Sequence, residues 1–210
     1  RKEVDWVQYQ IPANQAVPDK VHRINEMIKE KYDLRILQGL SKKQLAKRYG
    51  LKLFNTLNEA FADLFGYVPL NDKQKEFYIN QYFPFLDKRL ICLVVDKNDD
   101  VVAFGISMPS LSNALRKCKG RLFPFGWIHL LKALKIFENI DLYLNGVKPE
   151  WQNKGIHSIY YAEMNKQYIK LGSKMAIADP QLETNQAANI WKKYDSRIAI
   201  RRRAYIKTIE

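Results

Sequence analysis

The sequence predicts an α/β fold, and three stretches carry this prediction. Residues 89–96 (RLICLVVD) and 101–108 (VVAFGISM) are apolar, β-branched runs on either side of an Asn-Asp-rich turn, a pattern typical of an antiparallel hairpin. Residues 141–147 (DLYLNGV) have the length and alternation of another strand. After a tight turn, apolar residues recur at helical spacing from Ile156 to Leu171. Strands and helices therefore occur within one stretch of chain, as in α/β domains.

The N-terminal segment is predicted to be a linker followed by a helix. Residues 1–18 mix aromatic residues with prolines and show no sustained period, as in a linker or the end of a preceding region. Asp19 can cap a helix that carries apolar residues on one face. Because the chain opens at Arg1 and not at Met, we expect residues 1–32 to be the end of a longer N-terminal region.

The main domain is predicted to span residues 33–210, a length that can bury a full core. A short alternating run at 34–39 is its first strand. Residues 42–65 carry apolar residues at helical spacing and form one helix, or two helices joined near Gly50. Asp72 opens a further helix, whose aromatic stripe is more typical of helix packing than of a substrate wall.

A helical insertion is expected at about 110–138, because this stretch is long for a hairpin connection. Its second half places Trp127 and Leu131 on one face of an amphipathic helix, with lysines off that face. Contact of residues 121–137 with a membrane is one interpretation. Packing as a lid over an acceptor site, or against a further domain, is favoured because this amphipathic helix is short and contains only two lysines.

Composition excludes several classes of protein. Hydrophobic residues at 47% and aromatic residues at 12% exclude extensive disorder, and no apolar run is long enough to cross a membrane. The net charge of +13 suits nucleic acid, but the basic residues are dispersed and no nucleic-acid-binding signature accompanies them. We therefore expect a basic surface that favours polyanionic ligands, and no specific nucleic-acid partner.

The cysteines and histidines predict neither disulfides nor a metal site. Cys92 lies in a presumed buried strand and Cys118 in a Lys-rich loop, so neither has the spacing of a metal ligand. The three histidines are isolated from one another. Free thiols are typical of a reducing compartment, and we expect a cytoplasmic protein without a metal cofactor.

The turn between the strand at 141–147 and the following helix is suited to a phosphate. Such a turn directs unpaired backbone N–H groups and the positive end of a helix dipole at one spot. Its residues Pro149 and Gln152-Asn153-Lys154-Gly155-Ile156 resemble the acyl-CoA-binding signature of the GCN5-related N-acetyltransferase superfamily. That signature runs Val-x-Pro, then Gln or Arg-x-x-Gly-x-Gly or Ala, and His157 stands here in place of its last small residue.

This resemblance implies a fold and a cofactor. The fold is a mixed, mostly antiparallel central sheet flanked by helices, in which two strands splay apart where the pantetheine arm of acetyl-CoA, or of another acyl-CoA, enters. The strand at 174–181 is the predicted partner of the strand at 141–147. The turn amides hold the pyrophosphate, and the backbone before the turn contacts the pantetheine. The implied cofactor-binding residues are Leu144, Asn145, Gly146, Val147, Gln152, Asn153, Lys154, Gly155, Ile156, His157 and Asn185.

A second, partial resemblance follows at Glu183-Thr184-Asn185, which leads into a predicted helix with Trp191 and Tyr194. The family often has a Tyr seven residues after the Asn, where it can protonate the departing thiolate, and Lys192 occupies that position here. Tyr194, two residues further along the chain, is the candidate acid. Ordinary packing is its alternative role. The chain closes with a predicted hairpin or long strand at 198–209.

Acyl transfer to an amine needs a base, a stabilised oxyanion and a leaving thiolate. Val147 N–H is the family-like oxyanion donor, and Asp141 and Glu183 are the candidate bases. The sequence therefore predicts an acyl-CoA-dependent N-acyltransferase that works by direct attack in a ternary complex with an amine acceptor. A non-catalytic CoA-binding or interaction module of a larger protein is the alternative, motivated by His157 and Lys192. A peripheral, lipid-linked acyltransferase is a third interpretation.

Overall fold

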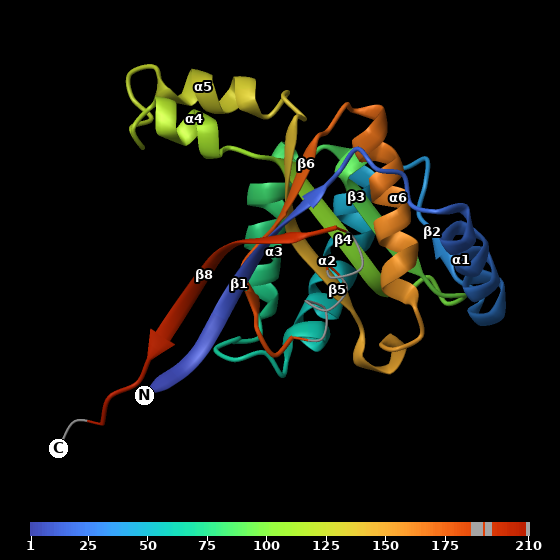
Figure 1. Ribbon diagram of the computed structural model, residues 1–210. Helices are drawn as coiled ribbons and strands as arrows, with labels where there is room; N and C mark the ends of the chain where they lie inside the picture. Colours follow the sequence, from blue (N-terminus) through green and yellow to red (C-terminus); the bar gives the residue numbers. More distant parts are fainter. Residues whose placement is uncertain (186–190, 192–194, 209–210) are drawn as a thin grey trace.

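A computed structural model describes residues 1–185, 191 and 195–208. Within these residues an eight-stranded sheet forms the centre of the fold, in the order β2-β3-β4-β5-β6-β1-β7, with β8 paired to β1 (Figure 1). The described strand pairs are antiparallel except for the parallel pair β5 and β6, so the predicted mixed, mostly antiparallel sheet is confirmed. The strands are β1 (Lys2–Pro12), β2 (Arg35–Ile36), β3 (Ile91–Val95), β4 (Val101–Pro109), β5 (Asn139–Val147), β6 (Met175–Ala178), β7 (Gln181–Leu182) and β8 (Arg197–Tyr205).

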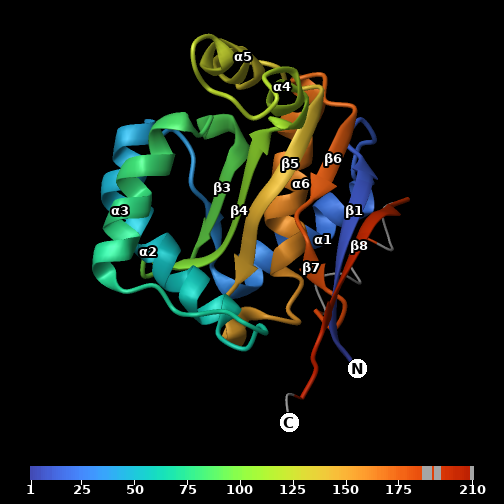
Figure 2. The ribbon, with the colours of Figure 1, turned by 90° about the vertical axis from the view of Figure 1, so that its left-hand side faces the viewer.

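Helices cover both faces of the sheet (Figure 2). Helices α1 (Asp19–Tyr32) and α6 (Ile156–Lys170) pack together on one face, and α2 (Lys42–Phe61) and α3 (Asp72–Tyr82) pack together on the other. Each face has its own apolar core, because alternate residues of the strands point to opposite sides. On the α6 face, the hydroxyl groups of Ser107 and Tyr168 hydrogen-bond at 2.7 Å and satisfy each other in the buried core.

Helix α2 is one continuous helix that runs through Gly50, which decides between the two predicted forms. It begins with a capping box, in which the Ser41 side chain accepts from the Gln44 amide and the Gln44 side chain accepts from the Ser41 amide. It ends at Phe61, earlier than the predicted residue 65.

The prediction of a linker over residues 1–18 is wrong, because residues 2–12 form strand β1 inside the sheet. Strand β1 pairs with β6, β7 and β8, and its side chains at Val7, Tyr9 and Ile11 are buried. The helix predicted after Asp19 is present as α1 and packs on α6. The apolar alternation of β1 was obscured by the polar residues between, one of which is a buried carboxylate.

The predicted insertion between β4 and β5 contains α4 (Ser112–Lys117) and α5 (Gly126–Ala133), which pack on each other and project from the body of the fold (Figure 1). No helix within the described residues is long and apolar enough to span a membrane.

Candidate functional site

The site is centred where β5 and β6 separate. The two strands pair in parallel register from Asn139↔Met175 to Leu142↔Ala178, and the register ends there. Beyond it a cavity of about 350 Å³ is lined by residues 142–145 of β5 on one side and residues 179–182 on the other. The cavity therefore lies between two diverging strands, as the resemblance implied.

A β-bulge at Tyr143 sets which side chains face this region. Ile106 of β4 pairs with Leu144 and Ser107 pairs with Leu142, so Tyr143 is the extra residue. As a result Tyr143 and Leu144 both face the side covered by α2 and α3, where they line a common cavity. Asn145 faces the other side, where its amide Nδ2 donates to the Tyr160 hydroxyl at 3.4 Å.

Two carboxylates lie at the point of separation. Asp141 is on β5, where burial raises the pKa of its carboxyl and a hydrogen bond from Ser110 opposes the rise. Asp179 directly follows β6 and lines the cavity between the strands. Burial raises the pKa of Asp179 to about 6, and the charge of Asp141 contributes to the rise. A carboxylate with such a pKa is suited to accept a proton near neutral pH.

Sequence reasoning missed Asp179. The available signal was an Asp-Pro pair at the end of a predicted strand, since a residue at that point faces the opening between two parallel strands when they splay. The predicted base Glu183 is placed differently. Its carboxylate forms ion pairs with Lys2 and with Arg201, the latter at 3.6 Å, beside the buried Asp5. This placement favours a structural role for Glu183.

The predicted phosphate turn has the expected backbone. A short 3-10 turn (Pro149–Trp151) follows β5, and Asn153 and Gly155 have positive φ values of 60° and 80°. Helix α6 then begins at Ile156, without a side-chain cap at Gly155. Because no residue with a side chain adopts φ near 80° readily, Gly155 is required by the turn. The amides of the first turn of a helix point out of its N-terminus, and here the Ser158 amide donates to the Gly155 carbonyl at 3.0 Å.

Side chains around the turn fix its shape and charge. The Gln152 amide Nε2 donates to the Val147 carbonyl at 3.2 Å, and this bond ties the turn back to β5. The Lys154 ammonium lies 4.9 Å from the Trp151 ring centroid and 5.4 Å from that of Tyr32. A cation is therefore held at the turn by two aromatic rings.

Several predicted cofactor residues have a packing role in this structure. The Ile156 side chain is buried in the core, so only its amide is available to a ligand. A Cβ on Gly146 would lie 2.9 Å from the Phe104 ring and 3.1 Å from Ala60, so this Gly allows α2 to approach the sheet. The Val147 side chain packs on the core of the α6 face. His157 is half-buried in the first turn of α6.

The second predicted motif is partly described. Asn185 lines the cavity between the strands. Trp191 is buried, packs edge-on against Tyr161 and donates from its indole Nε1 to Gln181 at 3.0 Å, which is a core role. Tyr194 and Lys192 lie outside the described residues.

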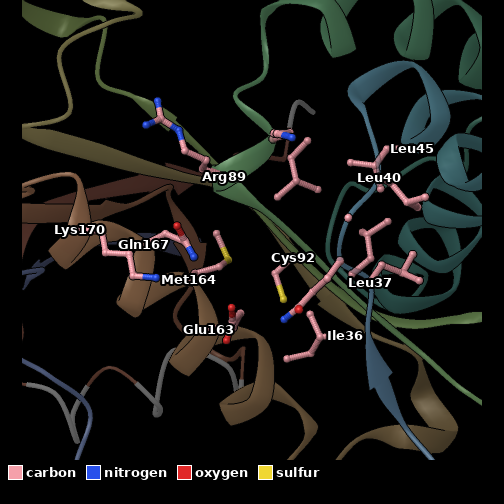
Figure 3. A pocket seen from close by; sticks show the side chains of 15 residues that line it. Ile36, Leu37, Leu40, Leu45, Arg89, Cys92, Glu163, Met164, Gln167 and Lys170 are labelled. Carbon is pink, nitrogen blue, oxygen red and sulfur yellow. The ribbon is translucent and has the colours of Figure 1, made fainter.

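A separate cavity of about 360 Å³ lies at the β2–β3 edge of the sheet (Figure 3). Leu40 and Leu45 lie on one side of it, and Gln167 and Lys170 of α6 on the other. Arg89 at its rim is bound by the Asp87 carboxylate at 2.6 Å. Its lining residues come from β2, β3, α2, α6 and the neighbouring loops, so it is distinct from the opening between β5 and β6.

Comparison with known proteins places this geometry among known folds. No family model matches the chain. The chain is 28% identical over 102 residues to the bacterial ceramide synthase of Caulobacter vibrioides, a match that spans 48% of this chain and 26% of that protein. The structure resembles a GCN5-related N-acetyltransferase from Sphaerobacter thermophilus, with a TM-score of 0.60, 12% identity, and coverage of 96% of this chain and 50% of the other.

It also resembles the GCN5-related glucosamine N-acetyltransferase region of a fungal multi-domain beta-N-acetylglucosaminidase, with a TM-score of 0.57, 13% identity, and coverage of 97% of this chain and 21% of the other. The chain thus spans about a quarter of the length of the ceramide synthase and half the length of the Sphaerobacter protein. At these identities the structural likeness shows the fold, which is that of the GCN5-related N-acetyltransferases.

Proposed function

We propose that this chain, whose fold is that of the GCN5-related N-acetyltransferases, transfers an acyl group from acyl-CoA to an amine. The observation that supports the proposal best is the position of Asp179. Its carboxylate, with a pKa of about 6, lines the opening between the splayed strands β5 and β6. The turn that is suited to a phosphate directly follows β5.

The residues present fit an acyl-CoA. The amides at the start of α6 and the Lys154 ammonium are matched to a pyrophosphate in charge and in donor type. Among the described residues, no strand pairs with β5 beyond Leu142 on its β6 side. Along residues 143–146, the backbone groups that do not pair with β4 therefore face this side, where they can bond to a pantetheine arm, which carries amides of its own. Bound there, acyl-CoA supplies an activated thioester carbonyl.

The chain supplies the base. We assign to Asp179 the proton that the amine loses as the C–N bond forms and the C–S bond breaks. Asp141 acts on Asp179 through its charge, which raises the pKa of Asp179. The Val147 N–H remains the proposed oxyanion donor and Tyr194 the proposed acid that protonates the thiolate, both from the family resemblance.

The test is thiol release from acetyl-CoA and longer acyl-CoAs in the presence of a broad panel of amines, with mass spectrometry of the acylated product. We expect amine-dependent thiol release with at least one pair of substrates. CoA binding by calorimetry without turnover on any acceptor would instead identify a non-catalytic CoA-binding module. Absence of both binding and turnover would contradict either function.

A further inference from the structure

An apolar cavity of about 380 Å³ lies beside the proposed acyl-transfer site, between α2, α3 and the strands β4 and β5. Its walls are leucine, isoleucine, methionine and aromatic side chains, and none of the described lining residues is charged. Leu53 and Leu57 of α2 form one wall, Tyr78 and Tyr82 of α3 another, and Met108 of β4 lies on the sheet side.

This cavity adjoins the opening between β5 and β6. Phe61, Tyr67, Tyr143 and Leu144 line both spaces. Asp179 lines the second space, so the polar end of a molecule that fills the apolar cavity would lie near the proposed base. The β-bulge that turns Tyr143 and Leu144 to the same side therefore places both side chains where the two spaces meet.

The polar side-chain groups of the described lining are the hydroxyls of Tyr67, Tyr78, Tyr82 and Tyr143. The Tyr67 hydroxyl donates to Asn58 Oδ1 at 2.6 Å. Asn58 Oδ1 also accepts from the Leu70 amide at 2.9 Å, so the Tyr67 hydroxyl and the Leu70 amide are satisfied within the protein. A space of this kind gains most from an apolar occupant, because burial of hydrocarbon is favourable in proportion to the area removed from water.

We propose that this cavity binds the alkyl chain of a long-chain substrate. The inference rests on the proposed acyl transfer and names the substrate class for it. The chain can belong to the acyl group of the donor or to the amine acceptor, since both converge at Asp179. The ceramide synthase similarity, which covers part of each protein, agrees with a substrate that carries such a chain.

Two substrate series distinguish the sources. The first varies the acyl-CoA from two to sixteen carbons with a short amine, and the second varies a primary alkylamine over the same range with acetyl-CoA. We expect kcat/KM to rise by about fourfold for each added methylene in one series, until the cavity is full. Flat dependence in both series, with thiol release intact, would overturn the inference and leave the proposed function standing.

A substitution that fills the cavity is the structural test. Leu70→Trp should reduce kcat/KM for the longest chain by at least about tenfold and leave the shortest substrate unchanged. Val68→Trp, at a side chain that is 77% exposed in the same loop, is the matched control and should change neither. If no donor is turned over, calorimetry with dodecylamine replaces kinetics. Binding that Leu70→Trp weakens would then support the cavity assignment, and no binding would refute it.

A different observation, on the projecting segment 110–137, carries a second inference that is independent of the first. Apolar side chains on this segment face solvent, with Phe123 81% exposed, Phe125 69% and Ile136 57%. The two helices of this segment, α4 and α5, pack on each other and extend away from the sheet (Figure 1). Large exposed apolar groups gathered on one projection mark an interaction surface.

The charge of this segment identifies the partner. Residues 110–137 contain six Lys or Arg residues and no Asp or Glu. Four of the six, Arg116, Lys117, Lys119 and Arg121, directly precede the exposed Phe123. Aromatic side chains next to a basic cluster match the boundary between acyl chains and anionic headgroups in a lipid surface. The sequence favoured a lid or packing against a further domain for this segment, and both stay predictions beside the lipid surface.

We propose that segment 110–137 docks the protein on an anionic phospholipid surface. The test is co-sedimentation of the protein with vesicles of phosphatidylcholine alone and with about one third phosphatidylglycerol. We expect binding to the anionic vesicles that weakens with salt. The double variant Phe123→Asp and Phe125→Asp should bind at least about tenfold more weakly. Phe77→Asp, at a side chain of α3 that is 59% exposed, should bind as wild type.

Equal retention of the wild type and the double variant on anionic vesicles would overturn the lipid assignment. So would concentration-dependent self-association, seen by sedimentation velocity, that the double variant abolishes, because the exposed face would then be an interface between copies. Circular dichroism of each variant, compared with wild type, verifies that the fold is retained.

Discussion

Asp141 lies on β5 and Asp179 directly follows the parallel strand β6, so both carboxyls lie at the point where the two strands separate. Burial raises the pKa of both carboxyls, and the pKa of Asp179, at about 6, also includes the effect of the Asp141 charge. Asp179 therefore changes charge near pH 6, and the following expectations depend on it.

The pH dependence of acyl transfer should follow Asp179. A base must be deprotonated to act, so kcat/KM should rise with pH through about 6. Asp179→Asn should remove this limb and lower kcat/KM by about 10²- to 10⁴-fold. Asp141→Asn removes the neighbouring charge and should shift the limb to lower pH with a smaller loss. Loss of the limb in Asp141→Asn, with Asp179→Asn still active, would assign the base to Asp141. Asp63→Asn, at an exposed carboxyl, is the control.

The stability of the fold should respond to Asp179 in the opposite sense from most carboxylates. Its pKa in the folded state is above the unfolded value of about 3.9, so folding favours the protonated form. The stabilisation is present below about pH 4 and is lost as the pH rises through about 6. Asp179→Asn resembles the protonated form and should therefore raise Tm at pH 7 but leave it unchanged near pH 3.5. A lower Tm at pH 7 would contradict the assignment.

Asp5 should show the reverse behaviour. Its side chain has no exposed surface and lies against Arg203, whose Nε donates at 2.7 Å, and Arg201, whose Nη1 donates at 3.0 Å. The Arg203 guanidinium holds the pKa of Asp5 well below its usual value, so the stabilisation is present above about pH 4 and is lost in acid. Asp5→Asn should lower Tm at pH 7 and speed hydrogen exchange in β8, which pairs with β1. An equal loss of Tm at pH 7 and at acid pH would show that packing, not charge, holds the pair.

The fold could be predicted from the sequence where alternation and turn chemistry are local. The hairpin β3–β4, strand β5 and helix α6 were predicted from alternation, turn residues and helical spacing, which are patterns among residues close together in the sequence. Strand β1 could not be predicted in this way, because its buried Asp5 is compensated by arginines that lie almost two hundred residues later in the chain. A carboxylate in a presumed loop gave no sign of that partner.

The site shows the same division. Gly155 was predictable because a tight turn before a helix needs a residue that tolerates positive φ. Asp179 was not, because its burial and its nearness to Asp141 depend on the register of β6 against β5. Gly146 lies in the predicted stretch, but its role is the contact between α2 and the sheet, which no local pattern reveals.

Gly146 provides a test of that role. Gly146→Ala places a methyl group against the fully buried Phe104 ring and should lower the free energy of unfolding by about 1–3 kcal/mol. Phe104→Leu makes room, so the added cost of Gly146→Ala should be smaller in the Phe104→Leu background. Urea unfolding of the two single variants and the double variant gives this comparison. Strict additivity of the two changes would show that the ring does not limit the space at Gly146.

The most direct test of the proposed acyl-CoA site is a calorimetric titration of CoA into the wild type, Gly155→Glu and Gly172→Glu. Gly155 and Gly172 flank α6 at opposite ends with φ values of 80° and 72°, so both variants add the same charge at a left-handed backbone position. A Cβ at Gly155 also lies 2.8 Å from Ile28 Cδ1, at the end of a flexible side chain, whereas one at Gly172 meets no atom within 4 Å. We expect the wild type and Gly172→Glu to bind CoA with a Kd below about 1 mM, and Gly155→Glu not to bind. No binding to the wild type, or equal binding to all three, would contradict the assignment of the turn.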